Sequence, residues 1–357
     1  MRPLRLLAAV TGSPRLLAAA PRTGTAPVHV PPDSLSGAGG TAPAPGRPSS
    51  RTRLRAWAEL LRVSALFTVP GDALAGAAAT GRRPGRGTAL AVGASLCLYE
   101  AGMALNDWAD REEDAVDRPH RPIPSGRVAP GAALAAAGAL TAAGLALAAR
   151  AGRPALAVAS GLAATVWAYD LRLKHTRLGP AAMASARALD LLLGATATAG
   201  AASAAPGPAG AHQPSAALPA ALALGAHTYA VTAVSRHEVQ GGSTAAPLAA
   251  LAGVAGLGAA ALRGRPAHGE PSPAPATGTL LLPAFVTAYL RTAAVPLLHA
   301  ALNPSPPLTR RAVGGGIRAM IPLQATLAAR AGSPLVGLAA MGLVPLARAL
   351  SRKVSPT

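Results

Sequence analysis

Apolar segments of about twenty residues alternate with short polar connectors from Trp57 to the C-terminus. A segment of this length crosses the hydrocarbon core of a bilayer as an α-helix, so the pattern predicts an all-α, polytopic membrane protein. The nine expected spans are residues 57–79, 88–108, 130–149, 154–172, 181–204, 216–235, 244–262, 277–300 and 332–350. Residues 311–330 contain three consecutive glycines near an arginine-rich start, and are either a tenth span or a helix at the membrane interface.

The composition agrees with a membrane protein and changes the interpretation of the charge. Hydrophobic residues make up 51% of the chain and charged residues 13%, about half the usual share of a soluble domain. The net charge of +19 is also typical of nucleic-acid-binding proteins. Here, however, the bases lie mainly in the N-terminal segment and the connectors, without a recognisable nucleic-acid module. We interpret the excess as loop charge that orients the spans, and expect no nucleic-acid partner.

The first fifty residues differ from the rest of the chain. They are rich in Pro, Gly, Ser and Arg, contain one acid, Asp33, and show no sustained periodicity, which predicts a disordered basic tail. Two apolar patches near the start are similar to a signal or transit peptide, but Gly, Ser, Pro and Arg interrupt them. The expected domains are therefore a tail, 1–50, and a transmembrane domain, 51–357.

The charge of the connectors indicates how the spans are oriented. The connectors after the second, fourth and sixth spans carry Arg or Lys, whereas the connector after the fifth, residues 206–215, carries neither. The excess of positive charge on cytoplasmic loops then places the even-numbered connectors in the cytoplasm of a bacterial-type cell. The connector after the first span, GRRPGRG, opposes this assignment.

The most strongly charged stretch, LNDWADREEDAVDRPHRPIPSGRV, begins at residue 105, within the last turn of the second expected span. Asn106, Asp107, Asp110 and Asp114 follow the spacing N-D-x-x-D-x-x-x-D. If the helix continues, the three carboxylates lie on one face and repel one another unless a cation lies between them. Mg²⁺ prefers such oxygen ligands together with substrate phosphates. The alternative is a solvated connector in which acids and arginines pair with one another.

Two arginines of this stretch are candidates for binding phosphate. Arg118 and Arg121 belong to RPHRPIPSG, in which three prolines restrict the backbone. Guanidinium groups held in fixed positions are suited to phosphate oxygens.

Other charged or polar residues lie in or next to later spans. Three candidates come at the end of the fourth span, namely Tyr169, Asp170 and Lys174. Arg187 and Asp190 are three residues apart inside the fifth. Ionisable groups in a span usually face a polar cavity or one another. For Arg187 and Asp190 a structural ion pair and a ligand-binding role are equally good interpretations.

These motifs resemble a known family. NDWADREED followed by RPHRPIPSG resembles the first signature of the UbiA family of intramembrane prenyltransferases, and YDLRLKHTRLG resembles the segment that follows the family's fourth span. The similarity extends from about Leu54 to the C-terminus. It implies about nine helices bundled around a central cavity, with charged cytoplasmic loops that bind a Mg²⁺-bound isoprenoid diphosphate. The implied reaction transfers the prenyl group to a small aromatic or lipid-like acceptor.

The resemblance also implies roles for individual residues. The implied metal-binding and catalytic residues are Asp107, Asp110, Asp114 and Glu238. The implied substrate-binding residues are Asn106, Arg118, Arg121, Tyr169, Lys174, Arg187 and Arg236.

The sequence departs from the family pattern after the sixth span, where several aspartates are usual. The segment SRHEVQGG offers one acid, Glu238, next to Arg236, and its alternative interpretation is a loop at the membrane interface. This departure is typical of a divergent subgroup. It also leaves open a second function, a membrane carrier that binds a prenylated or phosphorylated metabolite without chemistry. A secondary transporter would show internal repeats, which are not evident in the sequence.

Overall fold

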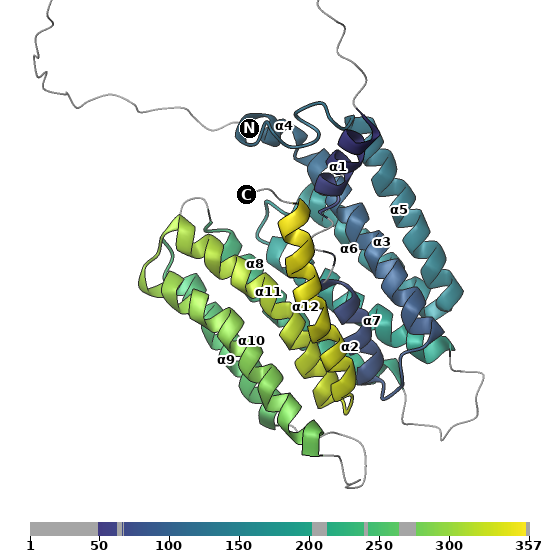
Figure 1. Cartoon of the computed structure of the whole chain (residues 1–357), viewed down its shortest axis with the longest axis vertical. Coiled ribbons are helices and arrows are strands. Elements are labelled where there is room, and N and C mark those ends of the chain that lie inside the picture. Colours follow the sequence, from purple (N-terminus) through teal and green to yellow (C-terminus); the bar gives the residue numbers. More distant parts are fainter. Residues whose placement is uncertain are drawn as a thin grey trace, which may run out of the picture. The chain divides into compact units, whose positions relative to one another are not determined.

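The computed structural model describes residues 49–62, 66, 68–201, 213–238, 242–263 and 276–354, and this part of the chain is helical without β-strands. Figure 1 shows the long helices lying side by side. Apart from Ser49 and Ser50, the predicted tail lies outside the described residues. The helices are α1 (Ser50–Leu60), α2 (Pro70–Ala79), α3 (Arg86–Ala109), α4 (Arg111–Asp117), α5 (Pro130–Ala151), α6 (Arg153–Ala168), the π-helical turn η2 (Tyr169–Leu173), α7 (Gly179–Ala201), the 3₁₀ turn η3 (Pro214–Ala217), α8 (Leu218–Ser235), α9 (Ala245–Arg263), α10 (Ala276–Leu302), α11 (Pro306–Arg330) and α12 (Pro334–Val354).

The helices confirm an all-α, polytopic membrane protein. In the described part of the chain, five segments are long and apolar enough to cross a membrane: α3, α5, η3 with α8, α9 and Leu280–Leu302 of α10. Residues 311–330, for which two interpretations were open, belong to α11. Buried residues occur along most of this helix, so it packs inside the bundle and is not an interfacial helix.

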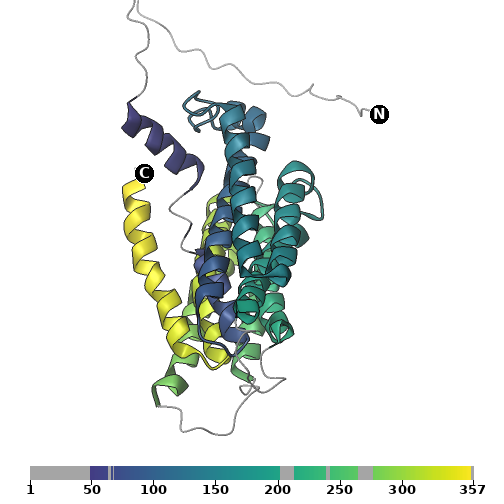
Figure 2. The same ribbon diagram turned by 90° about the vertical axis from the view of Figure 1, so that its right-hand side faces the viewer.

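The first predicted span, residues 57–79, is wrong as a single helix, because the structure divides it into α1 and α2. Helix α1 ends at Leu60, and Arg62 has a φ of 48°, which interrupts a right-handed helix. Helix α2 begins at Pro70, where the missing N–H of proline costs no hydrogen bond. Figures 1 and 2 show α1 and α4 at the same end of the bundle.

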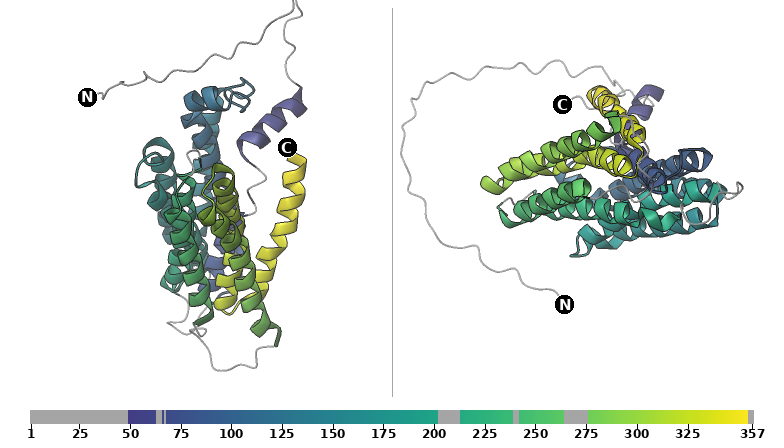
Figure 3. Two further views of the ribbon diagram at one scale, coloured as in Figure 1. Left: turned by 90° about the vertical axis from the view of Figure 1, so that its left-hand side faces the viewer. Right: turned by 90° about the horizontal axis from the view of Figure 1, so that it is seen from below.

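The connectors that carry the predicted site meet at this end. Long helices that follow one another are mostly antiparallel, so α3, α6 and α8 all end here, while α7 and α11 begin here (Figure 3). A hydrogen bond from the Arg236 guanidinium to the carbonyl oxygen of Thr176 joins the end of α8 to the connector between η2 and α7. The even-numbered connectors of the sequence therefore share one end of the molecule.

Small residues let α2 approach its neighbours closely. A β-carbon on Gly76 would lie 2.0 Å from the carbonyl oxygen of Leu191 in α7, and one on Gly194 would lie 2.4 Å from the Cα atom of Ala73. Such backbone contact between small residues is a common way to associate helices in membranes. It draws α2 into the bundle, where Asp72 is completely buried.

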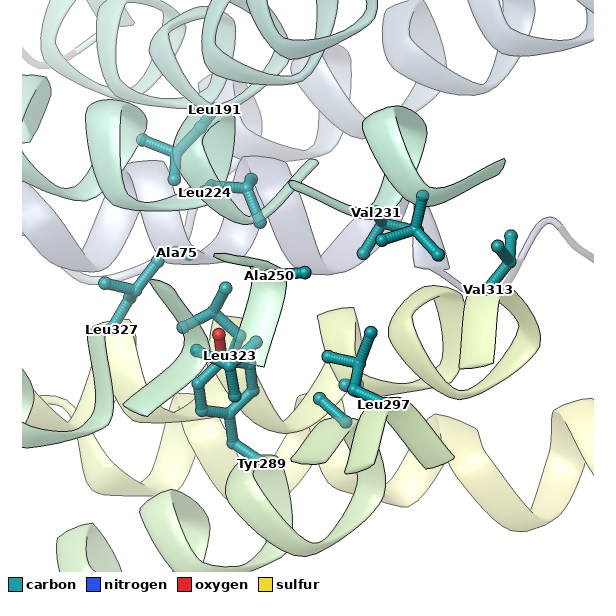
Figure 4. Packing of buried hydrophobic residues seen from close by; sticks show 14 of the residues in the cluster. Ala75, Leu191, Leu224, Val231, Ala250, Tyr289, Leu297, Val313, Leu323 and Leu327 are labelled. Atoms are coloured by element: carbon teal, nitrogen blue, oxygen red, sulfur yellow. The ribbon is translucent and has the colours of Figure 1, made fainter. Parts of the chain in front are cut away.

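A hydrophobic core lies among α2, α7, α8, α9, α10 and α11. Figure 4 shows Tyr289, Leu297 and Leu323 packed opposite Leu191 and Leu224. The hydroxyl of Tyr289 lies 3.0 Å from Nδ1 of the buried His227, so the polar end of the ring has a partner inside this apolar region.

We predict that Gly76→Ala lowers the thermal unfolding midpoint of the detergent-solubilised protein. The added methyl group has no space beside Leu191, and overpacking of this kind costs about 1–3 kcal/mol. The matched control is Gly253→Ala in α9, where a β-carbon meets nothing within 4 Å. Equal midpoints for the two variants would contradict the close packing of α2 on α7.

Candidate functional site

The charged stretch that begins at residue 105 is not one continuous helix. Helix α3 ends at Ala109 and α4 begins at Arg111, with Asp110 between them at φ −89° and ψ 5°. Backbone hydrogen bonds still cross this break, from Asp110 N to Asn106 O at 3.0 Å and from Asp114 N to Asp110 O at 2.8 Å. The expectation that the three aspartates share one helical face required a continuous helix, which the structure does not show. Asp110 also has a different partner from Asp107 and Asp114.

Asp107 and Asp114 face a group of arginines. Arg121 Nη1 lies 3.3 Å from Asp107 Oδ1 and 2.7 Å from Asp114 Oδ2, so one guanidinium joins both carboxylates. Arg62 Nη2 donates a hydrogen bond of 3.1 Å to Asp107, and Arg118 Nε lies 3.0 Å from Asp114 Oδ1. These contacts match the alternative in which acids and arginines of the stretch pair with one another. Arg62 was missed because it lies in the connector before α2, far away in the sequence.

The loop that carries Arg118 and Arg121 is tied to α1. Arg127 forms two hydrogen bonds with the Glu59 carboxylate, at 2.6 and 3.1 Å, and donates a third to the carbonyl oxygen of His120 at 2.6 Å. The Glu59 carboxylate raises the pKa of Arg127 above its usual value. The α1 helix thus holds in place a loop that the sequence predicted to be rigid from its prolines alone.

Asp110 belongs to a separate group of contacts between the ends of α3 and α6. Its carboxylate pairs with Lys174, and one helical turn earlier Asn106 Nδ2 donates a hydrogen bond of 3.1 Å to Asp170 Oδ1. One turn earlier again, a β-carbon on Gly102 would lie 3.1 Å from Cγ1 of Val166. Residues on α3 and on the α6–η2 segment therefore meet at three successive turns with a constant offset.

The π-helical turn η2 extends this register beyond the end of α6. Lys174 N donates to Tyr169 O at 2.9 Å, the i→i+5 bond that widens the turn. Such turns are frequent at functional sites. Here the turn carries Asp170 and Lys174, whose side chains both contact α3 or its end. Tyr169 begins the turn, and Asp170, a candidate from the sequence without an individual role, accepts the hydrogen bond from Asn106.

A pocket of about 390 Å³ opens beside the Asp110–Lys174 pair. Its lining combines carboxylates with cationic or imidazole side chains, at the end of the bundle where the connectors meet. The lining residues are Trp108, Ala109, Asp110, Arg111, Glu112, Glu113, Asp170, Leu171, Lys174 and His175.

Arg187 and Asp190 lie deeper in the bundle and do not contact the motif aspartates. Arg187 pairs with the fully buried Asp72 of α2, while Asp190 accepts a hydrogen bond from Ser95. Gln324 of α11 also donates to Asp72 Oδ1, at 2.6 Å. Arg187 thus forms an ion pair between helices with Asp72 as its partner, while its role in binding a ligand remains a prediction. Sequence patterns missed Asp72 and Gln324 because each is a single polar residue in an apolar segment.

Glu238 and Arg236 lie at the same end of the bundle, but the structure joins them to other groups. Burial raises the pKa of Glu238, and the positive charge of Arg310 opposes this rise. Arg236 is bound to the backbone of Thr176. The described residues show no hydrogen bond or ion pair between Glu238 and the first motif.

The fold and the charged pocket define a polytopic helical membrane protein with a polar site at one end of its bundle. The chain belongs to the UbiA prenyltransferase family, whose model matches residues 64–303. A solved UbiA homologue from Archaeoglobus fulgidus, described as bound to GPP and Mg²⁺, has a similar fold, with a TM-score of 0.54 and 19% identity. The similarity covers 80% of this chain and 99% of that one.

Curated relatives match shorter parts of the chain. Digeranylgeranylglyceryl phosphate synthase of Methanopyrus kandleri is 38% identical over 92 residues, which cover 26% of this chain and 34% of that protein. The synthase of the same name from Ignicoccus hospitalis is 38% identical over 148 residues, covering 41% of this chain and 48% of that protein. The chain thus spans less than half the length of these relatives.

We predict that Arg121→Ala destabilises the protein by about 3 kcal/mol, because it leaves Asp107 and Asp114 without their shared partner. The side chain of Asp114 is 1% exposed, so water cannot replace the lost guanidinium. The matched control, Arg118→Ala, removes a side chain that is 41% exposed and contacts only Asp114, and we expect it to cost about 1 kcal/mol or less. Thermal unfolding in detergent measures both variants, and equal losses would refute a central role for Arg121.

Proposed function

We propose that the protein is an integral-membrane prenyltransferase that moves an isoprenoid group from a polyprenyl diphosphate to a small acceptor. The observation that carries this proposal is the pocket in which Lys174 and Asp110 lie side by side. An ammonium group there can bind diphosphate oxygens, and a carboxylate beside it can hold a divalent cation that binds the same diphosphate.

The residues of the pocket fit Mg²⁺, since carboxylate oxygens are its usual protein ligands. Asp110 is the motif aspartate that borders the pocket and would be the principal ligand. Asp107 and Asp114 would act mainly by holding Arg62, Arg118 and Arg121 near it, and Glu238 would contribute from the end of α8. Bound Mg²⁺ would neutralise charge on the diphosphate as it leaves.

The reaction breaks the bond between prenyl carbon C1 and the diphosphate oxygen, and the electron pair leaves with the diphosphate. Lys174, and the arginines once a substrate draws them from their carboxylates, would stabilise that negative charge. A nucleophilic atom of the acceptor forms the new bond to C1 and then loses a proton. The apolar bundle would shelter the electron-poor prenyl chain from water.

The acceptor is proposed only as a class. The names of the relatives describe a glyceryl phosphate product, which favours a lipid-like acceptor over an aromatic one. The arginine-rich connectors support a cytoplasmic position for the pocket, within a domain that extends over residues 51–357.

We predict that Asp110→Asn and Lys174→Gln each lower turnover by about 10²–10³-fold, the usual effect of removing one charge-stabilising group. The measurement is release of diphosphate from geranyl, farnesyl and geranylgeranyl diphosphates with lipid-like and aromatic acceptors. Arg172→Gln is the matched control, because Arg172 belongs to the same π-turn but is exposed and does not line the pocket. Wild-type rates in the two pocket variants would contradict the proposed site. Binding of a donor without diphosphate release would instead identify a carrier.

We also predict that removal of divalent cations by EDTA abolishes diphosphate release and that Mg²⁺ restores it, because the diphosphate charge would then lack its counter-ion. Donor binding by the metal-free protein should weaken but persist through Lys174. Full activity in EDTA would rule out a metal-dependent mechanism.

A further inference from the structure

Three side chains at the pocket have the chemistry of a mixed metal site. One ligand atom each from Asp110, Glu113 and His175 lie within 4.8 Å of one another, the only such group of three among the described residues. All three residues line the pocket. They come from two segments more than sixty residues apart, so their meeting is a result of the fold and not of local sequence.

The register between α3 and the α6–η2 segment explains why these three side chains meet. Asp110 lies opposite Lys174, so His175, which follows Lys174, comes to the start of α4. Glu113 lies in the first turn of α4, three residues after Asp110, and on a helical path residues at this spacing are neighbours.

The two additional residues are free to bind a ligand. Glu113 and His175 are exposed, and neither forms a hydrogen bond or ion pair with another described residue. The base nearest to Glu113 in the sequence, Arg111, has other partners. It forms an ion pair with Glu112 at 3.1 Å, and its guanidinium carbon lies 4.8 Å from the centroid of the Trp108 ring. Asp110 already attracts a cation, the ammonium group of Lys174.

We propose that Asp110, Glu113 and His175 bind a divalent cation and that the imidazole makes the site prefer a first-row transition-metal ion such as Mn²⁺ over Mg²⁺. This inference rests on the proposed function only in taking the pocket as the substrate site. Two carboxylates and one imidazole suit Mn²⁺ and its neighbours, whereas Mg²⁺ strongly favours oxygen.

The site requires only a small rearrangement. Metal–ligand distances of about 2.0–2.2 Å put neighbouring ligand atoms about 3 Å apart. Rotation of the exposed Glu113 and His175 side chains can close the present separation without moving a helix. A cation on Asp110 would displace the Lys174 ammonium, which would then be available to the diphosphate in the same pocket.

The test is pulsed EPR of Mn²⁺ bound to the tag-free, full-length protein in detergent, without substrate. The account predicts modulation of the Mn²⁺ signal by a directly bound imidazole nitrogen, and its loss in His175→Ala. It also predicts that His175→Ala and Glu113→Gln weaken Mn²⁺ binding by about 10-fold or more, and that His175→Ala affects Mg²⁺ much less. The matched controls are Glu112→Gln, which removes the adjacent acid, and His299→Ala, which removes an exposed histidine of α10. Both should bind Mn²⁺ as the wild type does.

Absence of a nitrogen signal in the wild type, or wild-type affinity in His175→Ala, would overturn the inference. Because all three ligands can be replaced without opening a buried core, an unchanged thermal midpoint confirms that each variant is folded. The outcome is separable from that of the proposed function. Mg²⁺-dependent diphosphate release without a nitrogen ligand would support the transferase and refute this metal site. A nitrogen ligand without diphosphate release would support this metal site and refute the transferase.

Discussion

The candidate site depends on the parallel register between the end of α3 and the segment formed by α6 and η2. Gly102 permits close approach at Val166, Asn106 then binds Asp170, and Asp110 binds Lys174. Each step advances both segments by one turn. Polar groups inside an apolar bundle are costly without partners, so these contacts fix the relative position of the two segments. They also place Lys174, the only lysine that lines the pocket, beside Asp110.

Two other groups of buried charges are also paired. Arg121 satisfies two buried carboxylates at once, and Arg187 satisfies Asp72, which Gln324 also contacts. The motif aspartates are therefore divided between two tasks. Asp107 and Asp114 organise arginines, whereas Asp110 faces the pocket. In the proposed function, the motif is therefore a scaffold for arginines with one carboxylate directed at the ligand.

Hydropathy was sufficient to predict the class of fold, because span length depends only on bilayer thickness. It could not reveal the division of the first span at Arg62, which depends on one backbone conformation, or the break at Asp110. Asp110 and Lys174, which the motif singled out, both line the pocket, and their roles in binding remain predictions. Arg62, Asp72 and Gln324 were not predicted, because each acquires its partner only through the packing of distant helices.

The central claim is that diphosphate binds between η2 and the start of α4. The most direct test is a cryo-EM structure of the full chain in lipid nanodiscs with a divalent cation and a non-hydrolysable prenyl thiodiphosphate. The account predicts diphosphate density within hydrogen-bond distance of Lys174 Nζ, with the cation on Asp110 and the prenyl chain directed into the bundle. Diphosphate density at Arg236 and Glu238, or at Arg187, with the Asp110–Lys174 pair intact would contradict it.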